Sequence, residues 1–322
     1  AEMLRGRLPR LASLNCPAAT RLLCEGQAFV AKAGDLIGPE LMQWDWDYLE
    51  GHLPPDATFG VMLSDASDMG KVVMSHTARN GQRIVHGKAE TAGVTHDPEK
   101  ELDKTAHGLT TSDQMRMTFK EFREAAYRCR TKDGSHGMPQ GQLPYFGLHV
   151  LWRTRESDNG FVGQLDDVMK DDLWSGVRFD LLKEWQDANL LPKVQRFYVF
   201  AGLGGTLYHC HYDLQPNLHV QLTGKKRFVI FPPDDWQHLY PFPIHHDLDR
   251  RSMVNLDSPD DAMFPGWQGA HGMVVELGPG DILYIPPFWW HHVQSITPET
   301  TSMAMWFFER YPLDSQKRYG LS

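Results

Sequence analysis

The sequence predicts a mainly β fold with flanking helices, in which a β-sandwich or barrel follows an N-terminal α/β extension. The chain has 322 residues, 41% of them hydrophobic, which is enough apolar material for a sizeable core. Residues 196–308 consist of short runs rich in Val, Ile, Phe, Tyr and Trp. Pairs such as Gly204-Gly205 and Pro286-Pro287 separate these runs, a pattern typical of strands joined by turns.

The pattern along the chain predicts four segments. Residues 1–135 mix short helical and strand patterns and form the α/β extension, and the polar stretch 76–113 within it predicts long loops. Residues 136–195 are predicted to be a helical linker that packs on the barrel. The barrel itself is predicted over residues 196–310, and residues 311–322 are expected to form a C-terminal tail.

Two helices stand out upstream of the barrel. Thr118 is followed three residues later by Glu121, which is the spacing of a capping box, and Phe122 and Ala126 continue an apolar face. A second helical pattern runs from Asp166 to Asn189 and cannot continue through Pro192. Its large apolar residues predicted to face inward are Trp174, Leu181, Leu182 and Trp185.

Charge and cysteine usage limit the partners and the compartment. The net charge of −9 repels phosphate backbones and argues against a nucleic-acid partner. The four cysteines form no C-x-x-C pair, so we expect an intracellular protein of the cytoplasm or nucleus, without disulfides or structural zinc. The arginines among the first 23 residues leave organelle import open. The uncharged stretch 282–298 is broken by prolines and histidines and predicts no membrane helix.

A candidate metal site is divided between two distant parts of the barrel region. His211 and Asp213 are two residues apart, so on a strand both side chains point to the same face. His291, which follows the hydrophobic run 282–285, offers a third ligand. Two imidazoles and one carboxylate form a facial triad that leaves open positions and suits Fe(II). An alternative also stays open, because His209 and His211 form an H-x-H pair that suits a different metal centre.

Lys226 is the second chemical clue. In a strand it shares a face with Phe228 and Ile230, so its ammonium group is expected among apolar neighbours. A buried ammonium group needs a well-bonded anion, and a 2-oxoglutarate molecule bound to iron carries a distal carboxylate of this kind. The alternative is a lysine that extends from the strand end into solvent.

Together these motifs resemble the Jumonji-C (JmjC) family of Fe(II)- and 2-oxoglutarate-dependent oxygenases, and within it the asparaginyl hydroxylases typified by factor inhibiting hypoxia-inducible factor. The resemblance implies a double-stranded β-helix, the jelly-roll barrel of cupin and JmjC proteins. The motifs that occur in the family's order include His211-Tyr212-Asp213, Asn217, Lys226-Arg227, Phe231-Pro232-Pro233-Asp234, Leu239-Tyr240-Pro241, Gly278-Pro279-Gly280-Asp281 and Trp289-Trp290-His291-His292.

The resemblance also implies roles for individual residues. The catalytic metal ligands for Fe(II) are expected to be His211, Asp213 and His291. Lys226 and Tyr145 are expected to bind the distal carboxylate of 2-oxoglutarate, and Asn217 to lie beside its chelating end.

Several positions depart from the family pattern, among them Phe308, which stands where the family has a tryptophan. Tyr208 stands where the family has a threonine that helps to bind the distal carboxylate, and Trp306 stands where an asparagine is expected near the iron. Both are therefore expected to line the cofactor site. Arg250-Arg251 replaces the Arg-Gln pair that reads the target asparagine, and a second guanidinium favours carboxylates or other anions in the substrate site.

The expected activity is hydroxylation of a polypeptide side chain, with dioxygen as co-substrate and no membrane partner. Alternatives left open are hydroxylation of an RNA base or a small molecule, and a non-catalytic JmjC binding module, which the bulk of Trp306 would favour. Few residues follow Phe308, where the family's dimerising helices are expected, so monomer and dimer both remain open.

Overall fold

The computed structural model describes most of the extension and nearly all of the barrel region. The described residues are 6–67, 71–73, 76–77, 83–84, 114–130, 142–153, 161–162, 165–242 and 249–308. Most of the predicted polar stretch 76–113, and the whole predicted tail 311–322, lie outside these residues.

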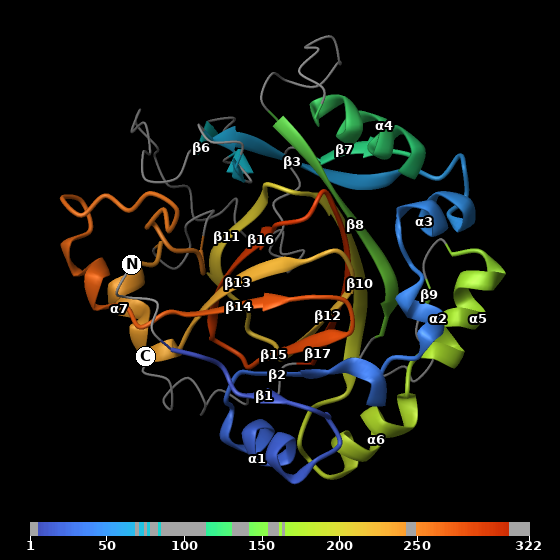
Figure 1. Ribbon diagram of the computed structural model, residues 1–322, viewed down its shortest axis with the longest axis horizontal. Coiled ribbons are helices and arrows are strands. Elements are labelled where there is room, and N and C mark those ends of the chain that lie inside the picture. The colour runs from blue at the N-terminus through green and yellow to red at the C-terminus, as the bar shows by residue number, and fades with distance from the viewer. Residues whose placement is uncertain are drawn as a thin grey trace, which may run out of the picture.

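Strands make up the centre of the molecule and helices flank it (Figure 1). The helices are α1 (Pro17–Glu25), α2 (Pro39–Met42), α3 (Trp46–His52), α4 (Phe119–Arg130), α5 (Asp167–Gly176), α6 (Phe179–Asp187) and α7 (Trp236–Leu239). The strands before the barrel region are β1 (Arg10–Leu11), β2 (Phe29–Lys32), β3 (Phe59–Ser67), β4 (Lys71–Val73), β5 (His76–Thr77), β6 (Arg83–Ile84), β7 (Gln114–Met117), β8 (Gln142–Trp152) and β9 (Phe161–Val162). Those of the barrel region are β10 (Val194–Leu203), β11 (Thr206–Tyr212), β12 (Asn217–Thr223), β13 (Lys226–Phe231), β14 (Met273–Leu277), β15 (Asp281–Ile285), β16 (Trp290–Ser295) and β17 (Glu299–Phe307).

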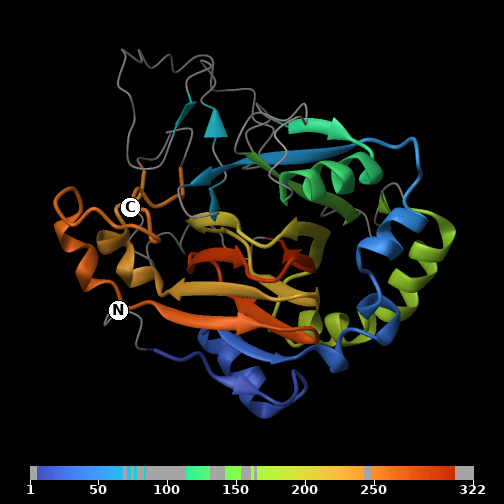
Figure 2. The same ribbon diagram turned by 45° about the horizontal axis from the view of Figure 1, so that its top comes forward.

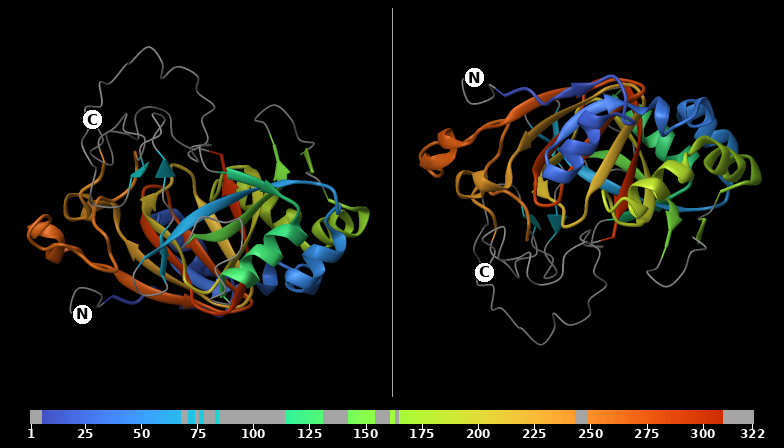
Figure 3. Two further views of the ribbon diagram at one scale, coloured as in Figure 1. Left: turned by 90° about the horizontal axis from the view of Figure 1, so that it is seen from above. Right: turned by 90° about the horizontal axis from the view of Figure 1, so that it is seen from below.

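One continuous, mainly antiparallel sheet curves around a single interior, as the views from above and below show (Figure 3). Its strand order is β1-β2-β15-β12-β17-β10-β8-β3-β4-β11-β16-β13-β14. Helices α2 to α6 lie along one side of this barrel and α7 lies on the opposite side (Figures 1 and 2). The architecture confirms the predicted mainly β, jelly-roll fold with flanking helices.

The two faces of the barrel strands have different chemistry. On β12, Leu218, Val220 and Leu222 belong to the hydrophobic core that the flanking helices share. The residues that alternate with them, such as Asn217 and His219, are also buried but point to the other face, into the barrel. The helices therefore cover the apolar outer face, and the interior combines these polar side chains with a second apolar cluster that includes Phe228 and Leu283.

Aromatic rings join the N-terminal extension to the barrel. The Phe122 ring centroid lies 5.1 Å from that of Trp46 on α3 and 5.4 Å from that of Phe146 on β8. The predicted capping box begins α4, because the Thr118 backbone N–H donates to Glu121 Oε2 at 2.8 Å and the Glu121 N–H donates to Thr118 Oγ1 at 3.2 Å. The cap fixes where α4 starts and thus where its apolar face meets the barrel.

The helical pattern after Asp166 forms two helices instead of one. The break falls at Val177, whose backbone is extended, and α6 then buries Leu181, Leu182 and Trp185 as predicted. The prediction for Trp174 was wrong, because 43% of this residue is exposed. Helix α5 buries Met169 and Leu173, which are four residues apart, and Trp174 projects about 100° away from that stripe.

The predicted linker range 136–195 also contains a strand. β8 pairs with β10 on one side and with β3 on the other, so this part of the chain continues the barrel sheet. The four segment boundaries stay a prediction. Among the described helices, none has the length and apolar character that crossing a bilayer requires.

We expect Phe122→Ala to lower the free energy of unfolding by about 3–5 kcal/mol, because it removes a fully buried ring and leaves a cavity between the extension and the barrel. Lys120→Ala, an exposed position of the same helix, is the matched control and should change stability by less than about 0.5 kcal/mol. Urea unfolding followed by tryptophan fluorescence measures both. Equal losses in the two variants would contradict this packing.

Candidate metal centre

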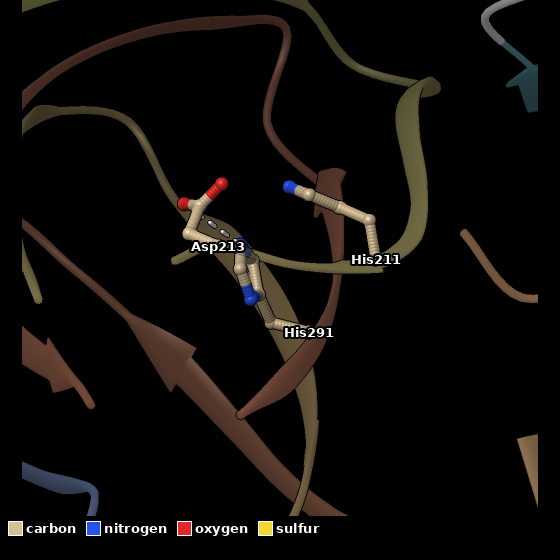
Figure 4. A group of neighbouring side chains, drawn as sticks. All are labelled: His211, Asp213 and His291. Carbon is tan, nitrogen blue, oxygen red and sulfur yellow. Dashed lines mark ion pairs between the residues drawn. The ribbon is translucent and has the colours of Figure 1, made fainter. Parts of the chain in front are cut away.

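Strands β11 and β16 bring the three predicted metal ligands together. The two strands are antiparallel, and His211 lies directly opposite His291 in their register. Their imidazole centroids are 4.1 Å apart. Asp213 follows β11 by one residue, and one potential ligand atom from each of the three side chains lies within 4.8 Å of the others. Figure 4 shows the three side chains converging on one point.

Backbone carbonyls set the orientation of both imidazoles. His211 Nδ1 lies 2.7 Å from the carbonyl oxygen of His209, and His291 Nδ1 lies 3.0 Å from that of Trp289. Each Nδ1–H donates to its carbonyl, so each Nε2 is left with a lone pair for a metal. Burial is the main cause that lowers the pKa of both histidines, so both rings are neutral, which is the form that binds metals.

Trp306 positions the carboxylate ligand. Its indole Nε1–H donates to Asp213 Oδ2 at 3.1 Å. The indole ring is held in turn by the Arg196 guanidinium, whose central carbon lies 4.8 Å from the ring centroid. The sequence predicts that Trp306 lines the cofactor site, and the structure places its indole against Asp213, a candidate metal ligand. Its N–H supplies a hydrogen bond to the carboxylate, a contact that the sequence analysis did not anticipate.

His209 belongs to a different pair of histidines. Its ring lies 6.2 Å from that of His292, which neighbours His291 on β16. Because side chains alternate along β11 and β16, the His209–His292 pair lies on one face of the sheet and the His211–His291 pair lies on the other. Within the described residues, the group able to hold a metal comprises His211, Asp213 and His291 and does not include His209. The geometry therefore favours the facial triad over the H-x-H alternative.

Lys226 is buried in the barrel interior, as its alternation with Phe228 predicted. It is 1% exposed, and its Nζ donates to Ser302 Oγ at 2.6 Å and to Tyr145 Oη at 3.2 Å. No carboxylate of the described chain lies within ion-pair distance of this ammonium group. Burial lowers the pKa of Lys226 to about 7. The extended lysine that reaches solvent is thereby excluded.

Polar atoms without partners line the interior between Lys226 and the metal group. Within the described residues, neither Asn217 Oδ1 nor His219 Nε2 has a hydrogen-bond partner, although both residues are buried. His219 lies within electrostatic range of Lys226 and His291, and its pKa is lowered well below the ordinary value by burial first and then by these two groups. The cost of such orphaned atoms indicates that a polar ligand belongs in this space.

The sequence motifs did not point to His219 and Ser302. Both could have been found from alternation, since His219 is two residues from Asn217 on β12, and Ser302 is four residues from Trp306 on β17. Strands β12 and β17 are adjacent, and Asn217 lies directly opposite Trp306 in their register.

Tyr208, Arg250 and Arg251 lie around His211, and Tyr208 also packs beside Tyr145, the hydroxyl partner of Lys226. The Tyr208 ring is 4.6 Å from the His211 ring, and its hydroxyl accepts a hydrogen bond from Arg251 Nη2 at 3.3 Å. Arg251 is 6% exposed and pairs with His211 through an isolated β-bridge. Arg250 has a left-handed backbone (φ 64°), and its Nε lies 3.8 Å from Asp249 Oδ2. The structure thus brings the two predicted substrate-binding arginines to the metal group.

Known proteins resemble this chain over far more of the sequence than the metal-site residues. A family model described as a cupin-like domain matches residues 66–312. Human HSPB1-associated protein 1 is 35% identical over 149 residues, which are 45% of this chain and 29% of that protein. Lysine-specific demethylase JMJ30 of Arabidopsis thaliana is 32% identical over 137 residues, which are 40% of this chain and 32% of that protein. Human tRNA wybutosine-synthesizing protein 5 is 41% identical over 85 residues, which are 26% of this chain and 25% of that protein.

The aligned part of the chain covers less than a third of the length of each of these three curated relatives. The matches confirm the predicted JmjC resemblance, and the finer similarity to asparaginyl hydroxylases stays a prediction. Because the family model spans more than half of the chain, this protein belongs to the cupin-like domain family.

Proposed function

We propose that this protein is an Fe(II)- and 2-oxoglutarate-dependent dioxygenase that hydroxylates a side chain of a polypeptide. The observation that carries the proposal is the buried Lys226 ammonium group, which has hydroxyl partners but no carboxylate partner within the described residues. It lies in the same interior as the three metal ligands and is separated from them by orphaned polar atoms. A small dicarboxylate that chelates the metal at one end and meets Lys226 at the other fits this arrangement.

The donor set fits iron. Two neutral imidazoles and one carboxylate from His211, His291 and Asp213 would hold Fe(II) and leave open positions. Iron bound there would supply an oxidative decarboxylation of 2-oxoglutarate to succinate and carbon dioxide, coupled to the insertion of one oxygen atom of dioxygen into a substrate C–H bond.

The chain itself binds and orients the co-substrate. The Lys226 ammonium group and the Tyr145 hydroxyl are placed to donate to the distal carboxylate, and Ser302 holds the ammonium in position. Asn217 and His219 offer polar atoms to the part of 2-oxoglutarate between its two ends. Trp306 and the two backbone carbonyls fix the ligand side chains before the metal arrives. Preorganisation of this kind is what a metal oxygenase needs from its protein.

A polypeptide substrate is supported by the names of two relatives, one an associated protein of HSPB1 and the other a lysine-specific demethylase. The second candidate substrate is a modified tRNA base, which the similarity to tRNA wybutosine-synthesizing protein 5 favours. The net charge of −9 opposes RNA binding, so the polypeptide is the better candidate.

The alternative to an enzyme is a non-catalytic binding module. If Trp306 blocked the cofactor site, such a module would bind the metal and would not bind 2-oxoglutarate.

The protein should form succinate from 2-oxoglutarate in the presence of Fe(II), ascorbate and oxygen, and faster with peptide substrates than without them. His211→Ala should abolish this turnover because it removes a metal ligand. His271→Ala, whose side chain is 83% exposed, is the control and should keep it. If the wild-type protein forms no succinate with or without peptides, and His211→Ala behaves like the wild type, the dioxygenase proposal fails.

Metal affinity gives a second prediction, because two adjacent histidines of β16 point to opposite faces. His291→Ala should weaken Mn(II) binding at least about 100-fold, since a ligand is lost. His292→Ala removes an equally buried imidazole from the other face and should change the affinity less than about threefold. Calorimetric titration under anaerobic conditions measures both, and similar losses in the two variants would rule out the assigned ligand set.

The affinity for 2-oxoglutarate should fall by up to about tenfold per unit as the pH rises from 7 to 9, because the distal carboxylate needs the protonated Lys226 ammonium and its pKa is lowered to about 7. Tyr145 and His219 do not titrate in this window, since the pKa of Tyr145 is raised and that of His219 is lowered. Calorimetry on the Mn(II)-loaded protein measures the slope.

Lys225→Met, at the exposed neighbouring position, should keep this slope, whereas Lys226→Met should lose both the slope and most of the affinity. A pH-independent affinity in the wild-type protein would contradict the role given to Lys226.

A further inference from the structure

A buried arginine with an unpaired N–H group lies beside the metal ligands. Arg251 is 6% exposed, and its backbone forms a β-bridge with His211. The neighbouring Ser252 N–H donates to the carbonyl oxygen of Cys210 at 2.9 Å, so the segment is fixed alongside β11. Directly paired residues on adjacent strands have Cα atoms about 5 Å apart and side chains on the same face. Arg251 therefore points to the side of the sheet from which His211 binds the metal.

Tyr208 holds the guanidinium group in that position. Arg251 Nη2 donates to the Tyr208 hydroxyl at 3.3 Å, and the guanidinium carbon lies 5.1 Å from the centroid of the Tyr208 ring. The same ring lies 4.6 Å from the His211 imidazole. These contacts use one side of the guanidinium, and within the described residues Nη1 has no hydrogen-bond partner although it is buried.

The charge around Arg251 is not balanced. No carboxylate of the described residues lies within ion-pair distance of its guanidinium. Two further guanidiniums lie near the metal group. Arg250, whose Nε is 3.8 Å from Asp249 Oδ2, acts electrostatically on His211, and Arg196 acts on Asp213. Within the described residues, Arg196 Nε also lacks a hydrogen-bond partner. A buried guanidinium without an anion is costly, so this site is built for an anionic ligand.

We propose that the residue hydroxylated by this protein is an aspartate, whose side-chain carboxylate binds the Arg251 guanidinium beside the metal. The inference rests on the proposed dioxygenase function and names its substrate. Lys226, with hydroxyl groups as its only described partners, takes the distal carboxylate of 2-oxoglutarate. Arg251 is held by Tyr208, which also packs beside Tyr145, but its backbone pairs with the metal ligand His211, so we assign its free N–H group to the substrate. Because Arg251 pairs directly with a metal ligand, the bound carboxylate and the reacting carbon lie close together, and the β-carbon of aspartate adjoins its carboxylate.

The reaction balances with the co-substrates already named. The Cβ–H bond of the aspartate breaks and a Cβ–OH bond forms, while 2-oxoglutarate loses carbon dioxide and becomes succinate. One oxygen atom of dioxygen ends in the hydroxyl group and the other in succinate. Arg251 remains protonated throughout and keeps the carboxylate fixed while the neighbouring carbon reacts.

Binding of degenerate nonapeptide libraries tests the proposal without requiring turnover. The central residue is fixed as Asp, Asn or phosphoserine, and dissociation constants are measured by fluorescence anisotropy with Mn(II) and 2-oxoglutarate present. The wild-type protein should bind the Asp library at least about tenfold tighter than the Asn library, and Arg251→Gln should remove or reverse this preference. Arg178→Gln, an exposed arginine paired with Asp180, is the matched control and should keep the preference.

Equal binding of the Asp and Asn libraries by the wild-type protein overturns the proposal, whether or not Arg251→Gln folds. A preference for phosphoserine overturns it in favour of a phosphate ligand. If Arg251→Gln instead weakens 2-oxoglutarate binding by tenfold or more and leaves the peptide preference unchanged, Arg251 serves the co-substrate and the proposal is wrong. An Arg251-dependent preference for Asp without succinate formation would retain the binding site and contradict the dioxygenase function.

Discussion

The interior of this barrel is organised around an ammonium group that has been removed from water. Lys226 contacts two hydroxyl groups, and burial alone lowers its pKa to about 7. A charged group in this position is unfavourable unless an anion arrives, so the site is costly when empty and favourable when a carboxylate binds. Lys226 shares its strand face with Phe228 and Ile230, which belong to a buried apolar cluster, so the ammonium group has little access to water.

Strand β17 sets the distance between the two ends of the site. Ser302, which binds Lys226, and Trp306, which binds Asp213, lie four residues apart on one face of this strand. β12 runs beside it in fixed register and places Asn217 and His219 in the space between. Ladder hydrogen bonds therefore fix the separation between Ser302 and Trp306, whereas Asp213 itself lies one residue beyond the end of β11. Because the sheet is rigid, only a co-substrate of matching length can reach from the metal to Lys226.

Much of this arrangement could be predicted from the sequence, and the rest depends on contacts between distant residues. Two-residue alternation correctly placed Lys226 in the interior, and the Thr118 capping box correctly placed the start of α4. Alternation says nothing about which strands become neighbours, so neither the indole contact with Asp213 nor the pairing of Arg251 with His211 could be derived. Trp174 was misplaced because a helix break shifts the buried stripe, and a pattern read across the break assumes one continuous helix.

A crystal structure of the protein grown without oxygen, with Fe(II) and 2-oxoglutarate, would test the central claim most directly. We expect a metal ion bonded to Nε2 of His211 and His291 and to a carboxylate oxygen of Asp213, and a distal carboxylate bonded to the Lys226 ammonium group. A metal ion held by other residues would contradict it. So would an oxoacid bound at the metal while Lys226 keeps its hydroxyl partners and meets no carboxylate.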